Sequence, residues 1–236
     1  MVPFADGTTQ EVYVLVGADG IHSSVRTALF GAERPEFTGV VAYRAVVPTE
    51  QVAGAPNLDA FTKWWGSDLN TQIVTFPLNR GRDTFIFATT PQESWTDESW
   101  TQPGDVEELR AAYTGFHHDA RMLLDACCGV LKSALYVRDP LVRWSDGNVT
   151  VLGDASHPMM PFMAQGAGQA IEDGSVLARH LGVPGRASDV SLCLFEEARL
   201  DRTAKIQLAS RGNTWLKDSG NADWVYEYDA WSVPVA

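Results

Sequence analysis

Two short apolar runs, each followed by a turn that contains glycine and aspartate, constrain this chain more than any other feature. The first run leads into residues 17–26, reading GADGIHSSVR, and the second leads into residues 153–158, reading GDASHP. A helix-like stretch follows each turn, so Asp19 and Asp154 are predicted to lie at the ends of two strands of an open α/β sheet. At that edge, helix N-termini and backbone N–H groups hold the phosphates and ribose of nucleotides.

The chain has the size and composition of a folded protein with a sizeable core. It contains 236 residues, of which 45% are hydrophobic and 20% are charged. This length suits one large domain or two small ones. The formal net charge is −12 and no cluster of Lys or Arg interrupts it, so a phosphate backbone would be repelled. Nucleic acid is therefore not expected as a partner.

The sequence predicts no membrane span, secretory signal or metal centre. The longest apolar runs, residues 12–18 and 39–47, are far shorter than the ~20 residues that cross a bilayer. Acidic residues occupy the N-terminal positions where a signal peptide has a basic start and an apolar core. The cysteines at 127, 128 and 193 form no C-x-x-C pair, which argues against a disulfide framework and against zinc. We therefore expect a cytoplasmic protein without membrane partners or metal.

The first half of the chain changes in pattern near residue 37. Residues 12–16 form a compact apolar run typical of a buried strand, and Ser23 and Gly31 are suited to begin and end the helix that follows. Residues 37–89 contain alternating and aromatic runs, with a turn-rich link at 77–81. This second pattern predicts an antiparallel sheet.

The second half is mainly helical in pattern. Asp105 and Glu108 form a plausible capping box, and residues 119–127 continue with a second helix. Residues 165–181 carry the strongest helical pattern, with acidic side chains toward the start and basic side chains toward the end, which complements the helix dipole. Residues 189–217 predict a further long helical region.

These patterns predict an α/β (α+β) fold, in which a partial Rossmann-like domain contains an inserted antiparallel-sheet domain and is followed by C-terminal helices. A strand expected at residues 149–152 returns the chain to the first sheet. We expect four successive parts: a nucleotide-binding part, the inserted sheet domain, a second nucleotide-binding part and a helical region. Their predicted bounds are residues 1–34, 35–140, 141–184 and 185–236.

The chain resembles the class A flavoprotein monooxygenases, which are FAD- and NAD(P)H-dependent aromatic hydroxylases of the salicylate hydroxylase and 6-hydroxynicotinate 3-monooxygenase type. Residues 14–26 are similar to the Asp-Gly motif of that family. Residues 151–174, reading VLGDASHPMMPFMAQGAGQAIEDG, are similar to its Gly-Asp motif. Tyr43, Arg44 and residues 223–231 also look like those of salicylate hydroxylase relatives, so the resemblance covers nearly the whole chain.

The resemblance implies a flavin site built from the two motifs. It places Asp154 at FAD hydroxyls and Asp19 near the pyrophosphate. It places the flavin pyrimidine edge at a helix start, where the partial positive charge of the helix can stabilise negative charge on the flavin. The implied cofactor-binding residues are Asp19, Arg26, Asp154, Pro161, Gly166, Ala167 and Gly168. The implied substrate-pocket residues are Tyr43, Arg44, Phe76 and Phe162, and no catalytic or metal-binding residue is assigned.

Each of these residues also has a structural interpretation. Asp19 can close a turn, Asp154 can cap a helix, and the glycines can serve a close helix crossing. Aromatic side chains on alternating strands pack most often in the core, and His157 is interpreted as a structural hydrogen-bonding residue. Phe162 stands where relatives carry a polar residue, commonly His, so the substrate within the family stays open.

The resemblance implies that the intact enzyme reduces FAD with NAD(P)H, forms a flavin C4a-hydroperoxide with O₂, and hydroxylates a small aromatic acid or phenol. The sequence does not decide whether the chain forms a homodimer. No Gly-x-Gly-x-x-Gly segment stands ahead of Asp19, where the family has its phosphate-binding loop. We therefore expect a fragment that folds weakly alone and binds little FAD. The alternatives are a non-catalytic truncated remnant, a subunit that needs a partner for the missing loop, or a hydroxylase of the polyketide or ubiquinone-pathway type.

Overall fold

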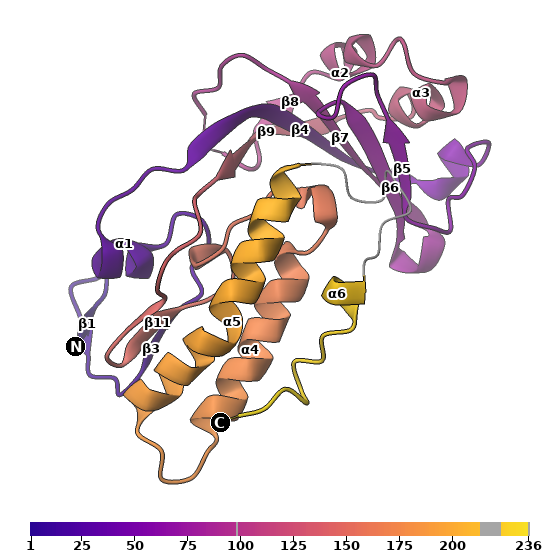
Figure 1. The fold of residues 1–236 in the computed structure, drawn as a ribbon. Helices are drawn as coiled ribbons and strands as arrows, with labels where there is room; N and C mark the ends of the chain where they lie inside the picture. Colours follow the sequence, from indigo (N-terminus) through magenta and orange to yellow (C-terminus); the bar gives the residue numbers. More distant parts are fainter. Residues whose placement is uncertain (98, 213–222, 236) are drawn as a thin grey trace. The chain divides into compact units, whose positions relative to one another are not determined.

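A computed structural model describes residues 1–97, 99–212 and 223–235, and the chain divides into two compact units. The first unit comprises Met1–Glu36 and Val137–Ala236, and the second comprises Phe37–Tyr136. Figure 1 follows the chain through both units and labels the elements. Each unit is described separately below. The four-part organisation expected from the sequence stays a prediction.

A small sheet lies at the centre of the first unit. Its strands run in the order β10 (Ser145–Asp146), β11 (Val149–Val151) and β3 (Leu15–Gly17). β11 runs parallel to β3, and Val151 pairs with Gly17. Because the two strands are parallel, the turns that carry Asp19 and Asp154 leave the sheet at the same edge. A hairpin of β1 (Val2–Pro3) and β2 (Thr9–Gln10) precedes β3.

The strand predicted at residues 12–16 is wrong in its extent. β3 begins only at Leu15, and Tyr13 is 93% exposed. Among the described residues β3 pairs with one neighbour, β11, which has three residues, so the preceding residues have no strand to bond with. An apolar run forms a strand only over the length that a partner covers.

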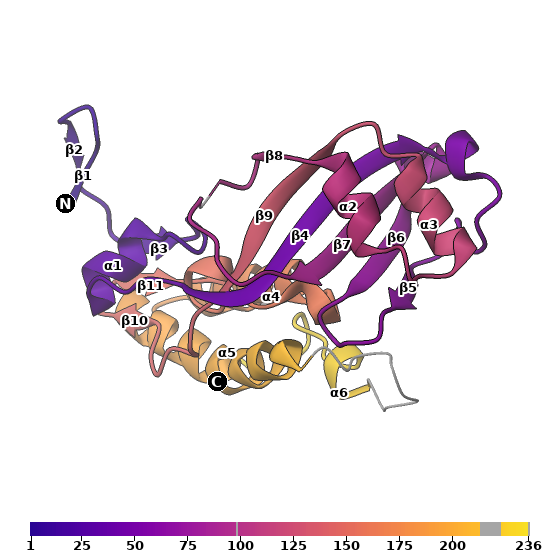
Figure 2. The ribbon, with the colours of Figure 1, turned by 90° about the horizontal axis from the view of Figure 1, so that it is seen from above.

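Helices cover the small sheet and enclose the core of the first unit. α1 (Ser24–Phe30) begins at Ser23 and ends at Gly31, as the sequence predicts. The long helices α4 (Gly166–Leu181) and α5 (Ser188–Arg211) lie side by side in both views (Figures 1 and 2). The core that they help to form contains Trp144, Val151, Ala155, Val176, Leu177, Leu192 and Phe195.

Short elements complete the first unit. They are the single-turn 3-10 helices η3 (Gly153–Ala155) and η4 (Pro161–Met163), and the four-residue helix α6 (Asp223–Tyr226). The helix predicted at residues 189–217 is confirmed up to Arg211, and residues 213–217 lie outside the described residues.

The second unit is a six-stranded sheet covered by two helices on one face (Figure 2). The strand order is β5 (Thr62–Trp65), β6 (Gln72–Leu78), β7 (Asp83–Pro91), β4 (Glu36–Pro48), β9 (Val130–Val137) and β8 (Pro103–Gly104). The strands from β5 to β4 pair antiparallel, as the alternating pattern predicts. η1 (Thr49–Val52) follows β4, and η2 (Asn79–Gly81) joins β6 to β7.

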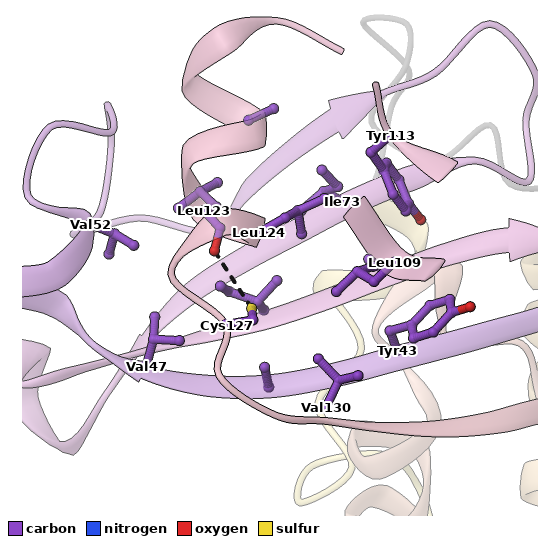
Figure 3. Packing of buried hydrophobic residues seen from close by; sticks show 14 of the residues in the cluster. Tyr43, Val47, Val52, Ile73, Leu109, Tyr113, Leu123, Leu124, Cys127 and Val130 are labelled. Atoms are coloured by element: carbon purple, nitrogen blue, oxygen red, sulfur yellow. Dashed lines mark hydrogen bonds between the residues drawn. The ribbon is translucent and has the colours of Figure 1, made fainter. Parts of the chain in front are cut away.

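Alternation along these strands gives the sheet two different faces. One face packs under α2 (Val106–Ala112) and α3 (His118–Asp125), and its core includes Ile86 as well as Tyr43 and Ile73, which Figure 3 labels. The neighbouring residues in each strand, among them Arg44 and Phe85, point to the opposite face. No helix within the described ranges is both long enough and apolar enough to cross a bilayer.

Candidate functional site

The two motif turns are joined by one buried arginine. Arg26 of α1 is only 3% exposed, and its Nη1 donates hydrogen bonds to the carbonyl oxygens of Ala155 and Ser156 at 3.3 and 3.2 Å. Its Nη2 forms an ion pair with Glu33 at 2.8 Å. α1 is thereby fixed to the turn that contains Asp154. In this structure Arg26, predicted to bind the cofactor, directs its terminal nitrogens to protein groups.

The carboxylate of Asp19 accepts three hydrogen bonds at the start of α1. Oδ1 accepts from the Ser23 hydroxyl at 2.5 Å, and Oδ2 accepts from the backbone N–H groups of Ser24 and Val25 at 2.8 and 3.3 Å. Ser23 in turn accepts from the Arg26 N–H. Desolvation alone would raise the pKa of Asp19, but the hydrogen bonds from Ser23 and the backbone lower it. The first three N–H groups of α1 are therefore already paired.

The carboxylate of Asp154 differs from that of Asp19 in its hydrogen bonds and in the direction of its pKa shift. Asp154 is exposed, and no side chain or backbone group in the described part of the chain donates a hydrogen bond to its carboxylate. The pKa of Asp154 is raised because the surrounding protein removes water from it, and the nearby His157 offsets only part of this effect. Its oxygens are available to a ligand that offers donors.

An uncapped helix start lies beside Asp154. The N-cap residue of α4, Gln165, makes no side-chain capping bond, and the first intrahelical bond runs from Gln169 N to Gln165 O at 2.8 Å. A Cβ placed on Gly166 would lie 4.0 Å from Asp154 Oδ1. The N–H groups of residues 166–168 and the dipole of this 16-residue helix therefore lie next to a free carboxylate.

The segment before α4 is held in an unusual conformation. Ala164 has φ 54°, in the left-handed region that non-glycine residues rarely adopt. It follows η4, in which Pro161 is exposed and Phe162 is 5% exposed. Strained residues of this kind cluster at ligand sites, because the surrounding fold holds them there. Phe162, predicted to line a substrate pocket, is buried within the first unit.

A buried charged cluster, which the motif reasoning missed, lies behind the turn. Asp173 of α4 is fully buried and accepts from Gly153 N at 3.0 Å, from His157 Nε2 at 2.5 Å and from Arg199 Nε at 2.8 Å. Burial alone would raise the pKa of Asp173, but the hydrogen bond and charge of His157 and the charge of Arg199 lower it. From the sequence, residues 172–173 are interpreted as acidic side chains near the start of a helix that complement its dipole. Only the packing shows that Asp173 faces inward.

The residues predicted for the substrate pocket do not share one face of the sheet in the second unit. Tyr43 is 1% exposed and packs in the core beneath α2 (Figure 3). Arg44 points to the other face, where its Nη2 bonds to Ser133 Oγ at 3.3 Å and its guanidinium lies 4.8 Å from the Trp100 ring centre. Phe76 lies on that face too, because its ring centre is 4.8 Å from that of Phe85.

Arg44 borders an open pocket of about 480 Å³. The pocket is largely apolar, with Val46, Phe85 and Leu131 in its wall. Desolvation lowers the pKa of Arg44, and its Nε is buried without a partner among the described residues. An aromatic ring fits the apolar wall, and an acceptor group fits the guanidinium.

Comparison with known proteins identifies the family. A family model described as an FAD binding domain matches residues 5–209. The chain is 40% identical over 235 residues to 6-hydroxynicotinate 3-monooxygenase of Pseudomonas fluorescens, covering 98% of this chain and 60% of that protein. It is 33% identical to 3-hydroxybenzoate 6-hydroxylase of Polaromonas naphthalenivorans, covering 95% of this chain and 55% of that protein.

Solved structures agree with this assignment. A substrate complex of salicylate hydroxylase superposes with a TM-score of 0.83 at 30% identity, covering 96% of this chain and 64% of that chain. CtdE in complex with FAD gives a TM-score of 0.77 at 28% identity, covering 96% and 62%. The α/β fold predicted from the sequence and the resemblance are thereby confirmed. The chain spans about 60% of the length of its first curated relative. It belongs to the FAD binding domain family of the class A flavin monooxygenases.

Proposed function

We propose that this chain is part of an FAD-dependent monooxygenase that hydroxylates a small aromatic acid or phenol with NAD(P)H and O₂. The names of the relatives support an aromatic substrate. One observation of the structure carries the proposal. The free carboxylate of Asp154 lies beside the uncapped start of α4, so an acceptor and several donors stand together at one edge of a parallel strand pair.

The chemistry of this edge fits FAD. The ribityl and ribose hydroxyls of FAD are donors that suit the Asp154 carboxylate, and the polarised edge of the flavin ring accepts from N–H groups. Small residues at 166–168 leave the backbone N–H groups of α4 open to a ligand. When bound, FAD supplies the redox chemistry that activates O₂, which no side chain of this protein can perform.

The protein residues then have separate tasks. Asp154 binds hydroxyls of the cofactor, and the N-terminus of α4 stabilises negative charge on it. Asp19 keeps α1 ordered next to this edge, and its three hydrogen bonds to residues at the start of α1 favour contact with the cofactor through water. In the second unit, Arg44 and the apolar pocket beside it accept the aromatic substrate.

Asp154→Ala tests this proposal in a direct FAD titration. We expect the wild-type chain to bind FAD weakly, with a Kd in the micromolar range or above, because it lacks a Gly-x-Gly-x-x-Gly loop for the pyrophosphate. We expect Asp154→Ala to raise the Kd about tenfold, since hydrogen bonds to a charged group contribute about 1.5 to 3 kcal/mol. Quenching of flavin fluorescence measures both values. Asp201→Ala, at an exposed position of α5, is the matched control.

An unchanged Kd in Asp154→Ala would contradict the proposed site. A second titration distinguishes the two alternatives, a subunit that needs a partner and a non-catalytic remnant. A polypeptide that carries a Gly-x-Gly-x-x-Gly strand and helix is added to the chain. If FAD binds only with that polypeptide present, the chain works as a subunit. If neither mixture binds FAD, the chain is a remnant. Product formation, rather than NAD(P)H loss, reports hydroxylation.

A further inference from the structure

We propose that Asp173 is the positioning residue of the flavin site. Its buried carboxylate holds the turn that carries Asp154 against α4, the helix whose first N–H groups are free. This inference rests on the proposed function, since it assigns Asp173 a part in flavin binding. Asp173 itself is fully buried, so its side chain is not in a position to contact FAD. It acts through the Gly153–His157 turn.

A single oxygen of Asp173 holds both ends of that turn. Oδ2 accepts from Gly153 N at 3.0 Å and from His157 Nε2 at 2.5 Å, and Asp154 lies between these two residues in the chain. The turn also sits directly on α4, because a Cβ on Gly153 would lie 3.2 Å from the Ala170 Cβ. With φ 59°, Gly153 adopts a conformation that glycine permits at low energy. The direction in which Asp154 leaves the turn is thus set by Asp173 and by close packing.

The other oxygen of Asp173 is fixed by α5. Oδ1 accepts from Arg199 Nε at 2.8 Å, and Arg199 Nη1 pairs with Glu172 at 2.6 Å. Arg202 also pairs with Glu172, at 2.9 Å. Two carboxylates therefore face two guanidinium groups, and their charges balance. Because all of these partners are held by helices, the Asp173 carboxylate cannot rotate away from the turn.

His157 completes the arrangement as a hydrogen-bond donor. Its Nδ1 is buried without a partner among the described residues, while Nε2 faces Asp173. A proton on Nδ1 would be a buried donor without an acceptor, which is unfavourable. A tautomer with its proton on Nε2 places no donor on Nδ1 and donates to Asp173. His157 thus behaves as a local hydrogen-bonding residue, in agreement with its structural interpretation.

Both halves of the flavin site depend on the same rigid element. Asp173 lies about two helical turns after Gly166 on α4, so the helix that offers N–H groups at its start also holds the Asp154 turn. Without the Asp173 contacts, the turn is free to move relative to the α4 N-terminus. We therefore expect the affinity for FAD to fall, because the Asp154 carboxylate is no longer held in place.

A double-mutant cycle on FAD affinity tests this coupling. We expect Asp173→Asn to raise the Kd for FAD about tenfold in the wild-type background and less than twofold in Asp154→Ala. In the second background the Asp154 carboxylate is already absent, so movement of the turn no longer affects FAD binding. Asp201→Asn is the matched control and is expected to leave the Kd unchanged. Equal fold-changes in both backgrounds would show a merely structural role and overturn the inference.

A measurement without FAD separates this inference from the proposed function. Amide hydrogen exchange of Gly153 is expected to be slow in the wild-type chain and faster in Asp173→Asn, with unchanged exchange in the centre of β7. If Asp173→Asn does not fold, His157→Leu replaces it, with His157→Gln as the variant expected to restore slow exchange. If neither the wild-type chain nor its mixture with the Gly-x-Gly-x-x-Gly polypeptide binds FAD, the proposed function fails, and Gly153 exchange alone decides whether Asp173 holds the turn. Unchanged exchange overturns the inference.

Discussion

Asp19 and Asp154 follow parallel strands in similar turns, yet their carboxylates have opposite surroundings. Asp19 accepts three hydrogen bonds and its pKa is lowered, whereas Asp154 accepts none from the described residues and its pKa is raised. A group whose pKa is raised on folding favours its protonated form in the folded state. Ionised Asp154 therefore opposes folding at neutral pH.

Asp154→Asn is predicted to stabilise the protein at neutral pH. The amide removes the charge, so we expect the free energy of unfolding at pH 7 to rise by at most about 0.5 kcal/mol, because solvent screens an exposed side chain. The gain should shrink as the pH falls toward 3.8, the ordinary pKa of the group, and vanish below it, because the wild-type carboxyl is then protonated in both states. Urea unfolding between pH 3 and pH 7 measures this. A gain that does not depend on pH would contradict the electrostatic cause.

At the scale of elements, the contact between the Gly153 turn and α4 sets the structure of the site. The turn and the helix approach closely enough that a single methyl group at Gly153 would crowd the Ala170 side chain. Gly147 lies in another turn of the same unit, with φ 57° and nothing within 4 Å of an added Cβ. The two glycines share their backbone conformation and differ in their packing, so they form a matched pair.

Gly153→Ala is predicted to destabilise the first unit more than Gly147→Ala does. Both substitutions place a methyl group in the left-handed region, which costs about 1 kcal/mol. Only Gly153→Ala must also push α4 away from the turn, so we expect an additional loss of about 1 to 3 kcal/mol. The difference between the two variants in urea unfolding isolates this contact. Equal losses would mean that backbone strain alone is responsible.

At the scale of the whole molecule, FAD should act as a stabilising ligand. A ligand that binds only the folded state raises the free energy of unfolding, by about 2.7 kcal/mol at a concentration 100 times its Kd. We therefore expect the thermal midpoint of the wild-type chain to rise with FAD concentration. The same concentrations should produce a smaller rise in Asp154→Ala, because its Kd is higher. A midpoint that does not respond to FAD in either chain would argue against FAD binding.

The sequence predicted the elements whose signals are local. Ser23 and Gly31 mark the ends of α1, Asp105 caps α2 by accepting from Glu107 N and Glu108 N, and the periodicity of residues 165–181 predicted α4 within one residue. Capping and periodicity depend on neighbours a few residues away, so one sequence is enough to recognise them.

The remaining features depend on partners that are distant in the chain. The strand at residues 12–16 was overextended because its length is set by β11. The resemblance assigns Tyr43 and Arg44 to one substrate pocket, but successive strand residues point to opposite faces, and the sequence alone does not show which face is open. Asp173 was missed because its donors come from Gly153, His157 and Arg199, which lie well before and after it in sequence.

The parallel pairing of Leu15 with Val149 has a consequence for biosynthesis. A ribosome adds residues from the N-terminus, so the strand that carries the Asp19 turn emerges long before its partner has been made. Local helices and the antiparallel sheet can form during this interval, but contacts of such high sequence separation form late. The edge that unites both aspartates is thus completed only after Val149–Val151 has been made, and β3 has no partner strand in the nascent polypeptide until then.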